Sequence, residues 1–133
     1  MDTRTKIVSS DEAAKAAAAC RARGGKVLAA TGYFDVLEAD HVRELCAAHS
    51  AAGADLVIVL PAHPPRPVLP LRARAEMAAA LAVVDYVVVT ENGPALEALL
   101  AALEPHTVVR LESADELRMR RLIDHVHRRH TSA

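Results

Sequence analysis

The chain has 133 residues, the size of one ordinary domain, and we expect a single domain over residues 1–133. Its 16 basic and 17 acidic residues give a formal net charge of −1, which argues against a general nucleic-acid-binding surface. No segment approaches the roughly 18 uninterrupted apolar residues of a membrane span, and no signal-peptide pattern opens the chain. We therefore expect a cytoplasmic protein whose partners include neither nucleic acid nor membrane.

The amino-acid composition predicts a thin apolar core. Hydrophobic residues make up 52% of the chain, but many of them are alanine, and aromatic residues make up only 2%. A core of Val, Leu, Ile and Ala suits a buried parallel sheet that is covered by alanine-faced helices. Because alanine contributes little apolar area, a homo-oligomer that covers more surface is an open alternative. The two cysteines, Cys20 and Cys46, match no redox or zinc spacing and are interpreted as small buried residues.

The first half of the chain predicts two helices around one short strand. Ser9 or Ser10, followed by two acidic residues, is typical of a helix start, and Gly24 with Gly25 is typical of a helix end. A short continuous apolar run then indicates a buried strand. The expected elements are a helix over 11–23, a strand over 26–30, a tight connection over 31–35 and a helix over 39–52.

The second half of the chain alternates strands with helices. Residues 55–60 form the clearest buried strand, and residues 61–70, with five prolines, cannot be regular structure. Pro94 suits the first turn of a helix, and Ser113 is typical of a helix cap. The remaining expected elements are a helix over 71–81, a strand over 85–89, a helix ending at 103, a strand over 107–111 and a helix over 113–129.

This order of elements predicts an α/β fold of the Rossmann-like kind. Parallel strands need long crossover connections, and each pair of predicted strands is joined by a helix. We therefore expect a doubly wound parallel sheet of about four to five strands, with helices on both faces. Right-handed crossovers bring the carboxyl ends of all strands to one edge, where such sheets bind ligands.

A motif stands directly after the first predicted strand and opens a helix. Residues 32–41 read Gly-Tyr-Phe-Asp-Val-Leu-Glu-Ala-Asp-His. This segment resembles the G-x-F-D-x-L-H-x-G-H signature of the cytidylyltransferase-like nucleotidyltransferases, and more narrowly the adenylyltransferase domain of the bifunctional ADP-heptose synthases. Further matches to that subfamily lie at residues 6–9, 66–68, 74–76, 84–88 and 104–109. The resemblance covers roughly residues 6–110.

The resemblance implies an enzyme that joins a sugar phosphate to a nucleotide and releases pyrophosphate. Enzymes of this family catalyse the reaction by positioning the substrates and stabilising charge. The ligands that the resemblance implies are ATP or CTP with Mg²⁺ and a sugar phosphate. His41 is the candidate catalytic residue. The nucleotide- or phosphate-binding residues that the resemblance implies are Thr31, Gly32, Tyr33, Phe34, His41, Arg66, Arg74 and Arg110.

The chain departs from the family where the phosphates are held. Glu38 stands in place of the first histidine and Asp40 in place of a glycine, so two negative charges face the expected phosphates. Ala30, residues 60–63 and residues 110–113 depart as well. We therefore expect a diverged nucleotidyltransferase with weak or no catalysis. Two alternatives stay open: an active enzyme in which Glu38 or Asp40 binds Mg²⁺, and a non-catalytic interaction or assembly domain.

Each candidate residue also has a structural interpretation. Gly32 and Phe34 are typical of a tight strand-to-helix turn with a core aromatic ring, and Asp35 is typical of a helix cap. His41, without its partner histidine, is a plain polar residue in this interpretation. A surface ion pair is the alternative to anion binding for Arg66 and Arg74, and a solvated terminal helix is the alternative to a metal site for His125, His127 and His130.

Overall fold

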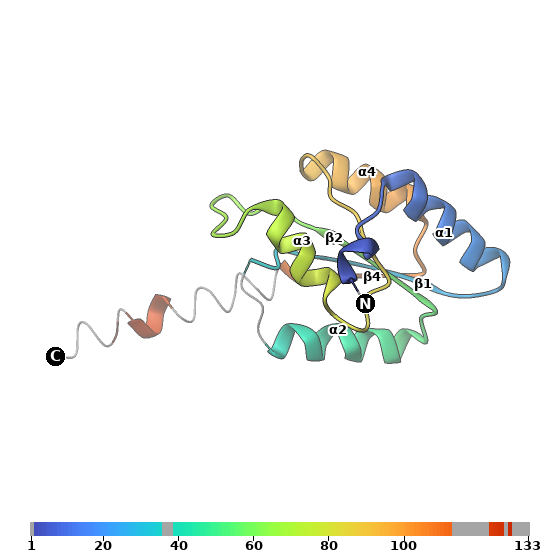
Figure 1. Cartoon of the computed structure of the whole chain (residues 1–133). Coiled ribbons are helices and arrows are strands. Elements are labelled where there is room, and N and C mark those ends of the chain that lie inside the picture. The colour runs from blue at the N-terminus through green and yellow to red at the C-terminus, as the bar shows by residue number, and fades with distance from the viewer. Residues whose placement is uncertain (1, 36–38, 113–122, 127, 129–133) are drawn as a thin grey trace.

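The structure is a computed structural model that describes residues 2–35, 39–112, 123–126 and 128 (Figure 1). Its elements are η1 (Thr3–Lys6), α1 (Ser10–Ala22), β1 (Val27–Gly32), α2 (Ala39–Ala52), β2 (Leu56–Pro61), α3 (Leu71–Ala79), β3 (Tyr86–Val87), α4 (Gly93–Leu103) and β4 (Thr107–Arg110). Strands and helices alternate as the sequence predicts. The expected helix from Ser113 lies largely outside the described residues, as do Glu38, His127 and His130.

The four described strands form one parallel sheet in the order β3-β2-β1-β4. Strand β1 pairs with β2 from Val27↔Leu56 to Gly32↔Pro61, and on its other side with β4 from Leu28↔Thr107 to Thr31↔Arg110. The strand order therefore reverses between β1 and β4. In a doubly wound sheet this reversal leaves a crevice beyond the carboxyl ends of the two strands. The parallel, Rossmann-like fold predicted from the sequence is confirmed.

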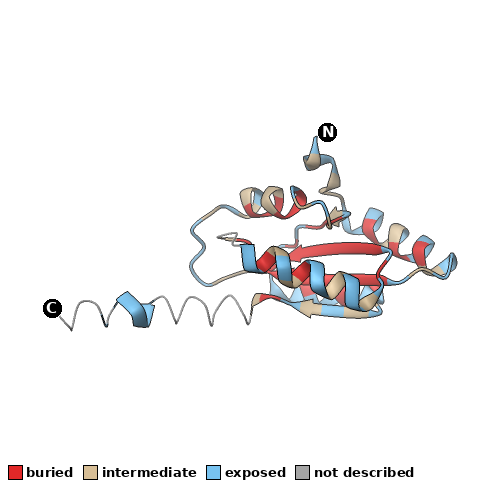
Figure 2. Cartoon of the chain, turned by 90° about the horizontal axis from the view of Figure 1, so that it is seen from below, coloured by how far each residue is buried: buried red, intermediate tan, exposed pale blue. Residues whose placement is uncertain are grey.

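Helices cover both faces of the sheet, and alternate strand residues face opposite layers. Ala29 packs with α1 and α4, whereas Leu28 and Ala30 pack with α2 and α3. Figure 2 shows the buried central strands between the helices, and a partly exposed β4.

Cys20 is buried as expected, but the same expectation was wrong for Cys46, which is exposed. Within the described residues, no helix is both long and apolar enough to cross a membrane.

Local signals in the sequence predicted most element boundaries to within a few residues. The Ser9 hydroxyl accepts the Glu12 N–H at 3.1 Å and caps α1. The Asn92 carboxamide accepts the Ala95 N–H at 2.8 Å and caps α4. Strand β3 is shorter than expected because its pairing with β2 takes in only the two residues Tyr86–Val87. Boundaries that depend on pairing with a distant strand are not encoded in the local pattern.

Three side chains hold the amino-terminal ends of the strands together. The Asp85 carboxylate accepts the Val57 N–H at 2.8 Å, and the Asp55 carboxylate accepts the Lys26 N–H at 2.9 Å. His106 Nδ1 accepts the N–H of the first β1 residue at 3.0 Å. These side chains satisfy backbone donors that would otherwise be left without a partner at the end of the ladder.

We expect Asp85→Ala to lower the free energy of unfolding by about 1–3 kcal/mol, because it leaves the buried Val57 N–H unpaired. Asp55→Ala is the matched control, since the Asp55 bond lies in an exposed setting where water replaces it. Its loss should stay below about 1 kcal/mol. Urea denaturation of both variants measures the difference, and equal losses would contradict this account of the sheet edge.

Candidate functional site

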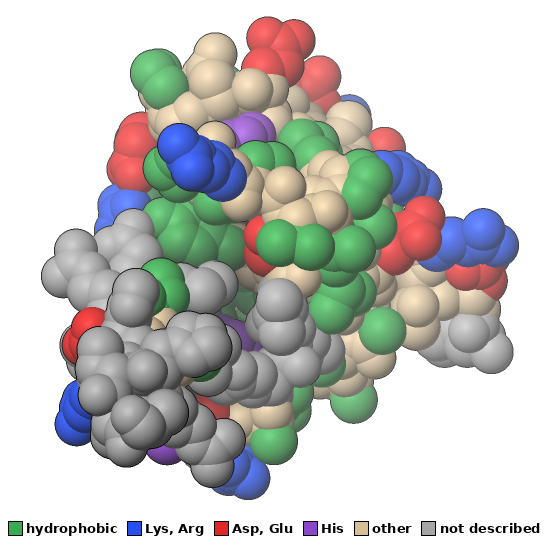
Figure 3. Space-filling view, turned by 90° about the vertical axis from the view of Figure 1, so that its left-hand side faces the viewer, with side chains coloured by type: hydrophobic (Ala, Val, Ile, Leu, Met, Phe, Trp, Pro, Cys, Tyr) green, Lys and Arg blue, Asp and Glu red, His purple; other side chains and the backbone are tan. Residues whose placement is uncertain are grey.

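The candidate site lies at the carboxyl edge of the sheet, between the ends of β1 and β4. Figure 3 looks onto this side of the molecule. In its described part, hydrophobic side chains cover much of the middle, and the Lys and Arg side chains lie apart from one another. A phosphate site needs convergent donors and positive charge, so the partner of each basic residue decides what this edge can bind.

Two apolar side chains pack against Gly32 on the side where any other residue would carry its Cβ. A Cβ at this position would lie 3.1 Å from Leu111 Cβ and 3.1 Å from Phe34 Cε2. Phe34 is 4% exposed and has a φ of +52°, which is unusual for a residue other than glycine. The turn therefore places the Phe34 ring in the core, and the glycine allows Leu111 to pack against the end of β1. This is the structural role that the sequence left open for Gly32 and Phe34.

A carboxylate lies beside the end of β1. Thr31 is fully buried, and its hydroxyl lies 2.9 and 2.7 Å from the two carboxylate oxygens of Glu112. Backbone pairing fixes this contact, because the Leu111 N–H donates to the Thr31 carbonyl at 2.7 Å. The sequence marked the turn after β4 as unusual but gave no sign that Glu112 reaches Thr31.

Arg110 is engaged by carboxylates of the same chain. Its guanidinium donates two hydrogen bonds to Glu97 on α4, at 2.7 and 3.0 Å, and lies 3.9 Å from Glu112. The bond from Arg110 lowers the pKa of the Glu97 carboxyl, and the same bond raises the pKa of Arg110. Arg110 thus lies at the expected edge, but its charge is already paired.

Arg74 is a buried structural residue of the edge. It is 3% exposed, and its Nη1 donates to the carbonyls of Tyr33 at 3.0 Å and Ala62 at 2.7 Å. Its Nε donates to the Leu69 carbonyl at 3.3 Å. These three carbonyls belong to the β1–α2 connection, the end of β2 and the proline-rich loop. The guanidinium therefore joins the β1–α2 connection, 41 positions away at Tyr33, to the end of β2 and the proline-rich loop.

Asp35 holds the proline-rich loop rather than a helix end. Its two carboxylate oxygens accept the N–H groups of Val68 and Leu69, both at 2.7 Å. The expected role of Asp35 as a helix cap is therefore wrong. Arg66, in the same loop, is exposed and makes no hydrogen bond or ion pair with any described residue.

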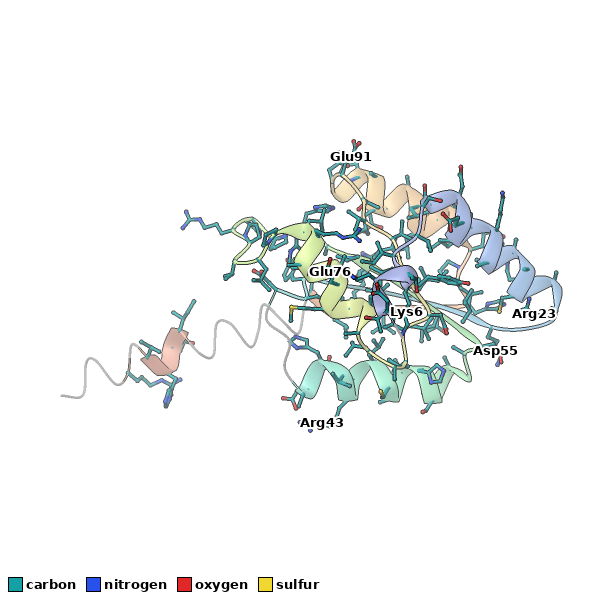
Figure 4. The ribbon with its side chains drawn as sticks, in the orientation of Figure 1. Lys6, Arg23, Arg43, Asp55, Glu76 and Glu91 are labelled. Carbon is teal, nitrogen blue, oxygen red and sulfur yellow. The ribbon has the colours of Figure 1, made fainter. Side chains whose placement is uncertain are left out.

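The remaining motif residues lie around the first turn of α2. His41 is buried there, whereas Asp40 is exposed and forms an ion pair with Arg43. Arg43 extends away from the sheet at the amino-terminal end of α2 (Figure 4). Tyr33 is half-buried and packs against the layer of α1 and α4. In the described part of the chain, no three His, Cys, Asp or Glu residues are grouped to hold a metal ion, and Glu38 lies outside that part.

A second polar pair lies at the ends of β2 and β3. His63 Nε2 is 3.1 Å from the hydroxyl of Thr90, which is buried. The sequence singled out the segment that contains His63 but not Thr90, because the two residues are 27 positions apart. The structure thus groups Thr31, Gly32 and Arg110 at the β1–β4 crevice, and places Arg74 beneath the loop instead.

We expect Arg74→Met to lower the free energy of unfolding by about 3 kcal/mol or more, because three carbonyls lose a charged donor. Arg66→Met is the control and should change stability by less than about 0.5 kcal/mol, as exposed residues usually do. Denaturant titration compares the two variants. If Arg74 were an anion ligand without a structural role, both would behave like Arg66→Met.

We expect Arg110→Gln to raise the pKa of the Glu97 carboxyl toward its ordinary value, because the hydrogen bond that lowers this pKa is lost. The pKa of Glu97 is lower in the folded chain than in the unfolded chain. The ion pair therefore stabilises the fold at pH values above the ordinary carboxyl pKa. This stabilisation is lost as the pH falls through the pKa of Glu97 in the folded chain. Carboxyl ¹³C NMR titration measures the shift. Arg43→Gln, which affects Asp40 instead, should leave Glu97 unchanged.

The chain is similar to curated proteins that share one name, bifunctional protein HldE. It is 36% identical over 117 residues to the protein of Pelobacter propionicus, 40% over 114 residues to that of Acidiphilium cryptum and 31% over 148 residues to that of Wolinella succinogenes. These matches take in 82%, 79% and 99% of this chain but only 24%, 23% and 31% of the relatives. The chain therefore spans about a quarter of the length of these relatives. No protein-family model matches it.

A solved structure has a similar fold. The lipopolysaccharide core biosynthesis protein of Thermoplasma volcanium superposes with a TM-score of 0.54 and 21% identity, over 63% of this chain and 72% of that one. At this identity the likeness concerns the fold alone. The chain is a homologue of the HldE proteins over one segment of their length, and its predicted resemblance to the nucleotidyltransferase domain of the bifunctional ADP-heptose synthases is confirmed.

Proposed function

We propose that the chain is a diverged nucleotidyltransferase-like domain that does not catalyse nucleotidyl transfer at a significant rate. The packing around Gly32 carries this proposal. In the family the glycine lets the backbone approach a phosphate, with the helix amino terminus as the anion site. Here Leu111 fills the space beside Gly32, together with Phe34, which the family signature also has, so Leu111 is the residue that distinguishes this chain.

The hydrogen-bond partners of the arginines support the same proposal. Charge stabilisation is the main source of catalysis in this chemistry, and one missing donor costs about 10²–10³ in rate. Arg74 is buried against three carbonyls, and Arg110 is paired with Glu97. Of the arginines expected to bind phosphate, Arg66 alone has no partner among the described residues. A polyphosphate would have to displace existing hydrogen bonds to reach Arg74 or Arg110.

The alternative with a metal ion has weaker support. Asp40, one of the two proposed Mg²⁺ ligands, is exposed and already paired with Arg43. An enzyme of this kind would need Glu38 and Asp40 to hold the ion together, with Arg43 displaced. A non-catalytic role in assembly with other proteins is compatible with this proposal.

The test is pyrophosphate release from ATP and CTP with Mg²⁺ and a panel of sugar phosphates. We expect release at the background rate, because among the described residues Leu111 packs against Gly32 and both Arg74 and Arg110 are already hydrogen-bonded within the chain. An HldE protein with similarity to this chain is the positive control. Sustained release by the pure wild-type chain would overturn the proposal.

A restored motif sharpens this test. The double variant Glu38→His, Asp40→Gly supplies the missing signature residues but leaves Leu111 against Gly32. We expect it to stay at background. Release by this variant would show that the motif residues alone had silenced the domain, and the packing at Gly32 would then not be the cause.

A further inference from the structure

The hydroxyl of Thr31 already binds an anionic group, the carboxylate of Glu112. Thr31 is the fifth residue of β1 and is fully buried, and its hydroxyl contacts Glu112, two residues beyond the end of β4. The two carboxylate oxygens lie 2.9 and 2.7 Å from it. A hydroxyl has one proton, so it donates to one oxygen at a time.

A cation lies close to the same carboxylate. Arg110 Nη1 is 3.9 Å from Glu112 Oε1 and keeps its main hydrogen bonds with Glu97. Phosphate oxygens also bind to hydrogen-bond donors and guanidinium groups, and here a buried hydroxyl lies on one side and a guanidinium on the other. Glu112 therefore occupies a position whose chemistry suits an anion in general, not a carboxylate in particular.

We propose that Thr31 and Arg110 form a latent anion site, and that the chain blocks it with the carboxylate of Glu112. The ligand class is a phosphoryl or polyphosphate group. This inference rests on the proposed function, because it names an internal group that opposes phosphate binding in the non-catalytic domain. Two negative groups cannot share this hydroxyl, so an external phosphate competes with Glu112 for it.

The decisive variant is Glu112→Gln, which keeps the shape of the side chain and removes its charge. The probe is inorganic tripolyphosphate, titrated by calorimetry and by NMR of the Thr31 and Gly32 amides at fixed ionic strength. We expect the variant to bind the probe about tenfold or more tightly than the wild type, since a like charge at the contact strongly opposes association. Circular dichroism and a thermal melt establish that each variant is folded.

Two controls separate a site from a general effect of charge. Glu91→Gln makes the same change of charge at an exposed residue near the start of α4 (Figure 4), and distant exposed charges are screened, so a change below about twofold is expected. Thr31→Val in the Glu112→Gln background removes the hydroxyl and should abolish the gain in affinity.

Three results would overturn the inference. These are no gain in a folded Glu112→Gln variant, an equal gain in Glu91→Gln, and a gain that survives the loss of the Thr31 hydroxyl. None of them depends on pyrophosphate release. The pyrophosphate assay and the tripolyphosphate titration can therefore fail independently. The first tests the proposed function, and the second tests the anion site.

Discussion

A buried guanidinium holds the carboxyl edge of the sheet together. Arg74 donates to carbonyls of the β1–α2 connection, the end of β2 and the proline-rich loop, and it reinforces the backbone bond that the Ala62 N–H donates to Gly32. Asp35 adds two hydrogen bonds to the backbone of the same loop. The position of the loop, and therefore the shape of the edge, depends on charged groups that face inward. An arginine used in this way is not available to a ligand.

The crevice between β1 and β4 follows from the strand order, but its contents follow from the residues after β4. The reversal of strand order places the end of β4 beside Thr31 and Gly32. Residues with small or basic side chains at that point would leave an anion site open. Leu111 and Glu112 stand there instead, the first against Gly32 and the second on the Thr31 hydroxyl. A fold shared with the HldE proteins can therefore present a different surface to phosphate.

The sequence predicted the fold well because the relevant signals are local. The apolar runs, the Ser9 cap and the long crossovers lie within short windows, and they lead to a parallel sheet with few alternatives. The site was harder to predict, because each role depends on a distant partner. The sequence identifies Arg74 as a cation, but only the fold shows that carbonyls surround it. Glu112 lies 81 positions from Thr31, and no local pattern connects them.

An NMR titration of the wild-type chain with ATP and Mg²⁺ tests most directly the claim that the crevice is closed by the chain's own side chains. The amide signals of Thr31, Gly32 and His41 report on the end of β1 and the start of α2. The account predicts that these signals stay in place at millimolar nucleotide, because Leu111 packs against Gly32 and Glu112 contacts the Thr31 hydroxyl. A saturable shift of the Gly32 and His41 amides would contradict it and would show that the crevice admits a nucleotide.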